Sequence, residues 1–243
     1  SGKDQPVVLV GKGVTFDSGG ISLKSGAKMD EMKFDMCGAA SVLGVMRAVA
    51  EMNLKVNLTV VVPTVENMPA HDASKPGDVV KSMSGQTIEI LNTDAEGRLI
   101  LCDALTYCEK FSPKVVIDIA TLTGAAAVAI GHYGMVSMHK DSEKDHKYLK
   151  KSGDETHERL AEFPFWSDYD ELIKSDVADI KNLGGPAGGA ITAGKFLAHF
   201  IEYPWIHLDI AGPTFVKAKY GYRGKGATGM GVRLLYQFIK NRA

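Results

Sequence analysis

The feature that most constrains the fold of this chain is a regular alternation of short β-branched runs with segments whose apolar residues recur at helical spacing. A run at 6–10 is followed by a glycine-rich stretch and then by helical spacing over 37–51, and a hairpin is expected over 79–91. Further strands are expected at 56–62, 114–120, 135–138 and 205–210, and further helices at 96–111, 142–159, 191–201 and 229–239. Because no repeat or linker divides residues 1–243, we predict one domain with an α/β fold, a three-layer α/β/α sandwich around a mixed, largely parallel central sheet.

The charge balance and the hydropathy pattern exclude two classes of partner. Lys and Arg number 28 against 29 Asp and Glu, so the net charge is -1, and the basic residues are scattered rather than clustered. This distribution lacks the basic patch that binds a phosphate backbone, so nucleic acid is not expected as a partner. The longest apolar stretch, 115–131, is broken by Asp118, threonines and glycines and is too short to span a bilayer, so no membrane association is expected.

The cysteines and the first residues bear on the cellular setting. Cys37, Cys102 and Cys108 have no C-x-x-C spacing and lie in apolar, helix-like surroundings, which favours buried free thiols in a reducing, cytoplasmic environment. The first ten residues, SGKDQPVVLV, contain neither a signal-peptide pattern nor an initiating Met. We therefore expect a chain that is truncated at its N-terminus.

Two glycine-rich stretches, 11–20 and 92–98, carry acidic residues at the ends of predicted strands, where α/β folds place their sites. Asp94 and Glu96 are two residues apart, so both side chains would point to one side if the strand conformation continues. Clustered carboxylates repel each other unless a cation lies between them, and hard oxygen ligands suit Mg²⁺, Mn²⁺ and Zn²⁺. Asp17 and Asp35 are the additional candidate ligands. The alternative is that Asp94 and Asp35 cap the helices that follow them.

Other catalytic classes have weaker support. Lys12 lies between two glycines but lacks the rest of a P-loop, there is no G-x-S-x-G elbow, and the S-x-x-K at 25–28 has no companion motif. His157-Glu158 begins an H-E-x-x-H pattern, yet position 161 is alanine. The seven histidines form no pair with metal-ligand spacing, so we expect each to be structural or exposed.

Two motifs resemble those of a known family. NTDAEGRL at 92–99 and VGKGVTFDSGG at 10–20 resemble the leucyl aminopeptidase (cytosol aminopeptidase) family. The resemblance continues through MKFDMCGAA at 32–40, ATLTGA at 120–125 and WIHLDIAGP at 205–213, and so covers nearly the whole chain. It implies a metallo-aminopeptidase catalytic domain that lacks the family's separate N-terminal domain.

The resemblance also implies a role for particular residues. Two divalent ions, Mn²⁺ or Zn²⁺, would be held as a pair, with Lys24 polarising the scissile carbonyl and Arg98 holding a bicarbonate ion that serves as general base. The implied ligands are Lys12, Asp17, Asp35 and Glu96 for one ion and Asp17, Asp94 and Glu96 for the other. The implied substrate-binding residues are Met32, Asn92, Thr121, Leu122 and Gly124.

By the same resemblance, the reaction is hydrolysis of N-terminal, preferentially leucine-like, residues from peptides. The substrate's α-amine would bind one ion and its carbonyl the other, and a metal-bridging hydroxide would attack. The full-length protein would be a homo-hexamer. Two alternatives stay open: a dipeptidase of the same family acting on Cys-Gly-type substrates, and a catalytically inactive binding or scaffold fragment.

Overall fold

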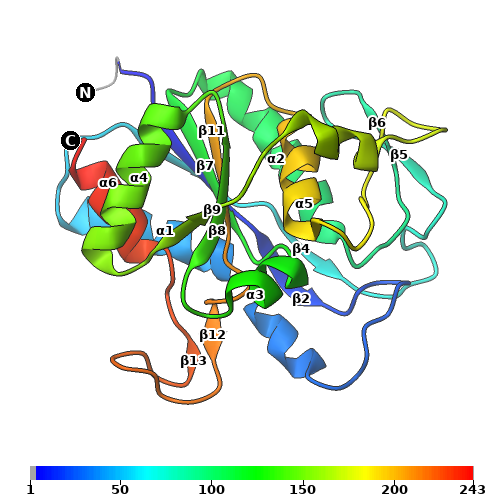
Figure 1. Cartoon of the computed structure of the whole chain (residues 1–243), viewed down its shortest axis with the longest axis horizontal. Helices are drawn as coiled ribbons and strands as arrows, with labels where there is room; N and C mark the ends of the chain where they lie inside the picture. The colour runs from blue at the N-terminus through cyan, green and yellow to red at the C-terminus, as the bar shows by residue number, and fades with distance from the viewer. Residues whose placement is uncertain (1–3, 243) are drawn as a thin grey trace.

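The computed structural model describes residues 4–242 and has three layers, with helices on both faces of a six-stranded sheet (Figure 1). The first four strands in the sheet order are parallel, the fifth is antiparallel to the fourth, and the edge strand is parallel to the fifth. In spatial order the strands are β3 (Leu58–Val61), β1 (Val7–Gly11), β7 (Val115–Ala120), β11 (Trp205–Asp209), β8 (Met135–Lys140) and β9 (Leu160–Glu162). The predicted α/β/α sandwich with a mixed, largely parallel sheet is confirmed.

The two faces of the sheet bury different sets of side chains, because successive residues of a strand point to opposite faces. On one face Leu9 and Ile117 pack in a core with α1 (Cys37–Glu51), α4 (Glu143–Thr156) and α6 (Val232–Lys240). On the other face Val8 and Val116 pack with the second set of helices. That set is α2 (Glu96–Cys108), α5 (Gly189–Ala198) and, against the β8 end, α3 (Gly124–Ile130).

Smaller elements surround the central sheet. A parallel pair joins β2 (Gly13–Asp17) to β4 (Thr64–Asn67), and a three-stranded sheet has the order β10-β6-β5. The remaining strands are β5 (Val79–Lys81), β6 (Thr87–Glu89), β10 (Ile180–Lys181), β12 (Phe215–Val216) and β13 (Gly226–Ala227), and the 3-10 helices are η1 (Met29–Phe34), η2 (Glu109–Phe111) and η3 (Ser167–Ile173). Among the described residues, no helix combines the length and the apolar character needed to cross a membrane.

Most predicted elements are present, with shifts at their ends. The helix at 37–51 is found with the predicted bounds, and the hairpin of β5 and β6 is antiparallel as expected. The helix expected over 96–111 ends at Cys108, since the next three residues tighten into η2. The glycine-rich stretch at 11–20 contains a strand, β2, that was expected to be loop. All three cysteines are free and buried, as predicted.

A close approach of α1 to the sheet depends on glycine. The chain packs so tightly here that a Cβ added at Gly38 would lie 2.1 Å from the carbonyl oxygen of Ile119. Two backbone hydrogen bonds fix the same place: Ala39 N donates to Lys12 O at 2.9 Å, and Lys12 N donates to Ile119 O at 3.1 Å. The missing side chain at Gly38 therefore helps to position the backbone of Lys12.

We predict that Gly38→Ala lowers the free energy of unfolding by about 1–3 kcal/mol, because the new methyl group overpacks the contact between α1 and β7. Urea denaturation measures the change. Gly26→Ala is the matched control, since a Cβ at exposed Gly26 meets no atom within 4 Å, and its effect should stay within about 0.5 kcal/mol. Equal stability of the two variants would contradict the steric explanation.

Candidate metal centre

The predicted site residues converge where the parallel strands β1 and β7 end. Lys12 follows β1, Asp17 is the last residue of β2, and Glu96 begins α2. They face a cavity of about 340 Å³. The predicted residues that line it are Lys12, Asp17, Lys24, Met32, Asp35, Asp94, Glu96, Thr121, Leu122 and Gly124.

Lys12 is a buried ammonium surrounded by oxygen atoms. Its Nζ lies 2.8 Å from Glu96 Oε1 and 3.0 Å from Asp35 Oδ2, and it donates to the carbonyl oxygen of Thr121 at 2.9 Å. Burial acts to lower the pKa of Lys12, but the charges and hydrogen bonds of Glu96 and Asp35 outweigh it, so the pKa is raised above its ordinary value. The Lys12 ammonium thereby offsets the charge of this part of the cluster.

Lys24 has the equivalent position beside the other two carboxylates. Its Nζ lies 2.9 Å from Asp17 Oδ2 and forms a second ion pair with Asp94. Burial acts against the charged form, yet hydrogen bonds to Asp94 and Asp17 raise the pKa of Lys24. Both lysines line the cavity, but the Lys24 side chain is 24% exposed, whereas that of Lys12 is 3% exposed.

The carboxylates repel one another, and their pKa values reflect this. Burial, together with the charge of Glu96, raises the pKa of Asp35 to about 7, although Lys12 opposes the shift. Burial also raises the pKa of Asp94, and the charges of Asp17 and Glu96 add to the effect. A site that raises carboxylate pKa values in this way favours the binding of additional positive charge.

The cluster provides the donors that a divalent ion requires. Asp17, Asp94 and Glu96 each offer a carboxylate oxygen, and these oxygens all lie within 4.8 Å of one another. The buried oxygens Asp35 Oδ2, Asp94 Oδ1 and Glu96 Oε1 face the ammonium groups of Lys12 or Lys24 and have no other partner among the described residues. Carboxylate-rich oxygen sets suit Mn²⁺ and are accepted by Zn²⁺. The residues therefore fit a divalent metal.

The alternative interpretation of Asp94 and Asp35 as helix caps is wrong. The N-cap residues of α2 and α1 are Ala95 and Met36, and neither makes a side-chain cap hydrogen bond. The strand conformation that would point Asp94 and Glu96 to one side is also absent. Strand β6 ends at Glu89, and a turn leads into α2. Their carboxylates meet because a turn residue and the first helical residue converge.

Two predicted residues do not line the cavity. Asn92 shapes the turn, since its Oδ1 accepts a hydrogen bond of 2.8 Å from the backbone N of Asp94. Arg98 is buried in the first turn of α2 and donates from Nη1 to the carbonyl oxygen of Asn182 at 2.8 Å. Burial lowers the pKa of Arg98 to about 10, and its buried Nε has no partner among the described residues.

Asn67, at the end of β4, supports the cluster and was not predicted. Its Nδ2 donates to Asp17 Oδ1 at 2.8 Å and to the carbonyl oxygen of Thr93 at 2.9 Å. It thereby ties the ligand-bearing end of β2 to the turn before α2. Thr121 supports Asp35 similarly, donating from Oγ1 to Asp35 Oδ1 at 2.6 Å. The sequence signal for Asn67 is weak, because it depends on the pairing of β2 with β4.

Comparison with known proteins agrees with this geometry. Residues 1–236 match the family model described as cytosol aminopeptidase family, catalytic domain. The chain belongs to this family. It is 59% identical to a probable cytosol aminopeptidase of Vesicomyosocius okutanii over 246 residues, which cover all of this chain and 50% of the relative. It is 60% identical to one of Thioalkalivibrio sulfidiphilus over 242 residues, 98% of this chain and 47% of the relative.

The chain also resembles solved structures. Bottromycin maturation enzyme BotP in complex with Mn matches with a TM-score of 0.94 and 36% identity, over 100% of this chain and 54% of that chain. Another BotP structure matches with a TM-score of 0.91 at the same 36% identity, over 98% of this chain and 53% of that chain. The chain spans about half the length of the curated relatives that it matches. The family resemblance stated from the motifs is confirmed.

We predict that Asn67→Ala weakens Mn²⁺ binding about 10- to 100-fold, because residues that orient metal ligands affect affinity to this extent. Electron paramagnetic resonance of free Mn²⁺ in a titration measures the affinity. Asn57→Ala is the control, since Nδ2 of exposed Asn57 donates to Asp4 O, outside the cluster. The orienting role fails if both variants bind Mn²⁺ like the unchanged chain.

Proposed function

We propose that this chain is the catalytic part of a two-metal aminopeptidase that hydrolyses N-terminal, preferentially leucine-like, residues from peptides. The observation that carries the proposal is the convergence of the Asp17, Asp94 and Glu96 carboxylates within 4.8 Å, beside Lys12 and Lys24. Residues 1–243 act as one catalytic domain in this proposal. The cytoplasm as the setting and a homo-hexamer as the full-length assembly belong to the same proposal.

The ligands of the two ions, Mn²⁺ or Zn²⁺, come from the cluster. Asp17 and Glu96 would contribute to both ions, Asp94 to one, and Asp35 and Lys12 to the other. A pair of divalent ions at this place supplies Lewis acidity and activates water at neutral pH. The buried oxygens of Asp35, Asp94 and Glu96, whose partners among the described residues are the ammonium groups of Lys12 and Lys24, support this assignment.

Lys24 would change partner when the ions bind. In the ligand-free protein its ammonium neutralises Asp17 and Asp94. With divalent ions held by those carboxylates, the Lys24 ammonium would be able to donate a hydrogen bond to the scissile carbonyl oxygen of a peptide in the cavity. A fixed positive donor at the oxygen where negative charge develops stabilises the transition state.

Arg98 would hold the bicarbonate ion that accepts a proton during hydrolysis. It lies two residues after Glu96, in the first turn of α2, and its Nε lacks a partner among the described residues. A small anion would satisfy this buried donor and offset the cost of burying the guanidinium charge. Asn92 would act on the substrate through the turn that it shapes.

The cavity wall supports a preference for apolar side chains. Met32, Leu122 and Phe215 line it, and Phe215 stacks on Phe34 with ring centroids 4.9 Å apart. Thr121 and Gly124 complete the substrate-facing wall between β7 and α3. A flexible methionine and an aromatic ring that line the same cavity provide an adaptable surface for a leucine-sized side chain.

Asp94→Asn tests the metal assignment. We expect it to lower turnover of leucine p-nitroanilide about 100-fold or more and to reduce bound Mn²⁺ below two ions per chain, because a neutral amide is a poorer ligand than a carboxylate. Elemental analysis of dialysed protein measures the stoichiometry. Asp72→Asn is the control, since the Asp72 side chain is 78% exposed. Full metal content in Asp94→Asn would overturn the assignment.

Lys24→Met separates catalysis from metal binding. We expect kcat to fall about 100- to 1000-fold, as on removal of a donor to the developing oxyanion. Bound Mn²⁺ should stay the same or bind more tightly, because the competing ammonium is gone. Steady-state kinetics with leucine p-nitroanilide and a Mn²⁺ titration measure the two effects. A variant that keeps its kcat would contradict the role of Lys24.

A further inference from the structure

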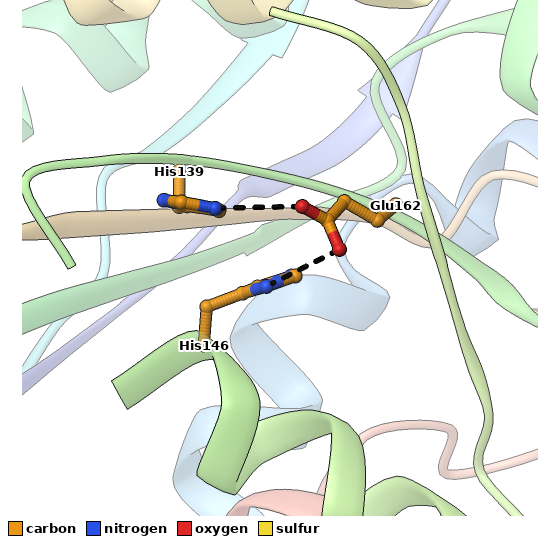
Figure 2. A group of neighbouring side chains, drawn as sticks. All are labelled: His139, His146 and Glu162. Carbon is orange, nitrogen blue, oxygen red and sulfur yellow. Dashed lines mark ion pairs between the residues drawn. The ribbon is translucent and has the colours of Figure 1, made fainter. Parts of the chain in front are cut away.

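A second group of metal-ligating side chains lies at the other end of the central sheet. His139 is on β8, His146 is in the second turn of α4, and Glu162 is the last residue of β9 (Figure 2). Because β8 runs antiparallel to β11, His139 lies opposite Ile206, near the start of β11. The carboxylate cluster lies beyond the opposite ends of the parallel strands. The two sites therefore do not share residues.

Three potential ligand atoms converge within this group. His139 Nε2 lies 3.6 Å from Glu162 Oε1, and His146 Nδ1 lies 3.8 Å from Glu162 Oε2. The two imidazole rings are stacked, with centroids 4.5 Å apart and planes inclined by 29°. One ligand atom from each residue fits within a 4.8 Å group. The fold thus joins residues of β8, α4 and β9 that have no motif spacing in the sequence.

The two histidine–Glu162 separations are longer than hydrogen bonds and slightly longer than those between ligands of one ion. Distances of 3.6 and 3.8 Å exceed hydrogen-bond length, so neither histidine shares a proton with Glu162. Ligands about 2.05 Å from a tetrahedral Zn²⁺ stand about 3.4 Å apart. Small side-chain adjustments would bring the three atoms to that spacing.

The hydrogen bonds leave the facing ring nitrogens available. His146 Nε2 lies 3.0 Å from Ser137 Oγ, and a ring that donates from Nε2 presents an unprotonated Nδ1 to Glu162. The buried Nδ1 of His139 has no hydrogen-bond partner in the described part of the chain, so no protein contact fixes that ring's tautomer. A ligand at Nε2 would hold it in place.

The donor types of the group also suit a cation. Two imidazoles and one carboxylate form a donor set that Zn²⁺ accepts, with a fourth position for water.

We propose that His139, His146 and Glu162 form a zinc-binding site, distinct from the carboxylate cluster, that ties the edge strand β9 to β8 and α4. The Glu162 side chain is 43% exposed, whereas His146 is 2% exposed, so an ion would enter from the side of Glu162. Lys150, whose Nζ lies 3.2 Å from Glu162 Oε2, is the competing cation. Imidazole ligands favour Zn²⁺ over Mn²⁺, in contrast to the all-carboxylate ligands of Asp17, Asp94 and Glu96.

The test uses the whole chain and Zn²⁺ as the probe. After equilibrium dialysis, we expect the unchanged chain to hold one more Zn²⁺ than either His146→Gln or Glu162→Gln. His71→Gln is the matched control, because the His71 side chain is 96% exposed. Imidazole NMR signals of His139 and His146 should shift on Zn²⁺ addition, which locates the extra ion independently of the catalytic centre.

Lys150→Met gives an opposite effect that simple misfolding cannot produce. Removing the ammonium beside Glu162 should tighten Zn²⁺ binding about 10-fold, whereas Lys151→Met, at a side chain 72% exposed, should leave the affinity unchanged. If His146→Gln does not fold, half-exposed Glu162→Gln answers the same question. Equal Zn²⁺ content in the unchanged chain and Glu162→Gln, or imidazole signals that do not respond to Zn²⁺, would overturn the proposal.

Discussion

The buried ammonium of Lys12 is the interaction on which the arrangement of the site depends. It joins the end of β1 to Glu96 at the start of α2, to Asp35 before α1 and to the backbone of Thr121 after β7. Removing one partner of such a network leaves an uncompensated buried charge, which costs far more than a surface ion pair contributes. The packing of α1 against the sheet, made possible by Gly38, holds the backbone from which this side chain extends.

The polarity of the sheet gives the molecule two chemically different ends. Parallel strands end together, so side chains that follow β1 and β7 meet at one edge without any motif that links them locally. The antiparallel strand β8 reverses this direction and carries His139 towards the opposite edge. Carboxylates therefore gather at one end and imidazoles at the other, and the two ends suit different divalent ions.

The sequence predicts those features that depend on local periodicity or on short motifs. The helix at 37–51 has the predicted bounds because its apolar residues keep helical spacing through the whole segment. The family resemblance implies twelve site residues, and ten of them line one cavity. The pairing of β2 with β4, the role of Asn67 and the group of His139, His146 and Glu162 could not be predicted, because each depends on contacts between distant segments.

Two lysines reduce the repulsion between the buried carboxylates of the cluster. Four carboxylates, those of Asp17, Asp35, Asp94 and Glu96, would repel one another strongly in a buried cavity, and two lysines placed between them remove part of that cost. Two ammonium groups do not neutralise four ionised carboxylates, and burial together with the remaining repulsion raises the pKa values of Asp35 and Asp94. The site thus retains an electrostatic demand for further positive charge. A more complete neutralisation by the protein itself would leave a divalent ion with less to gain by binding.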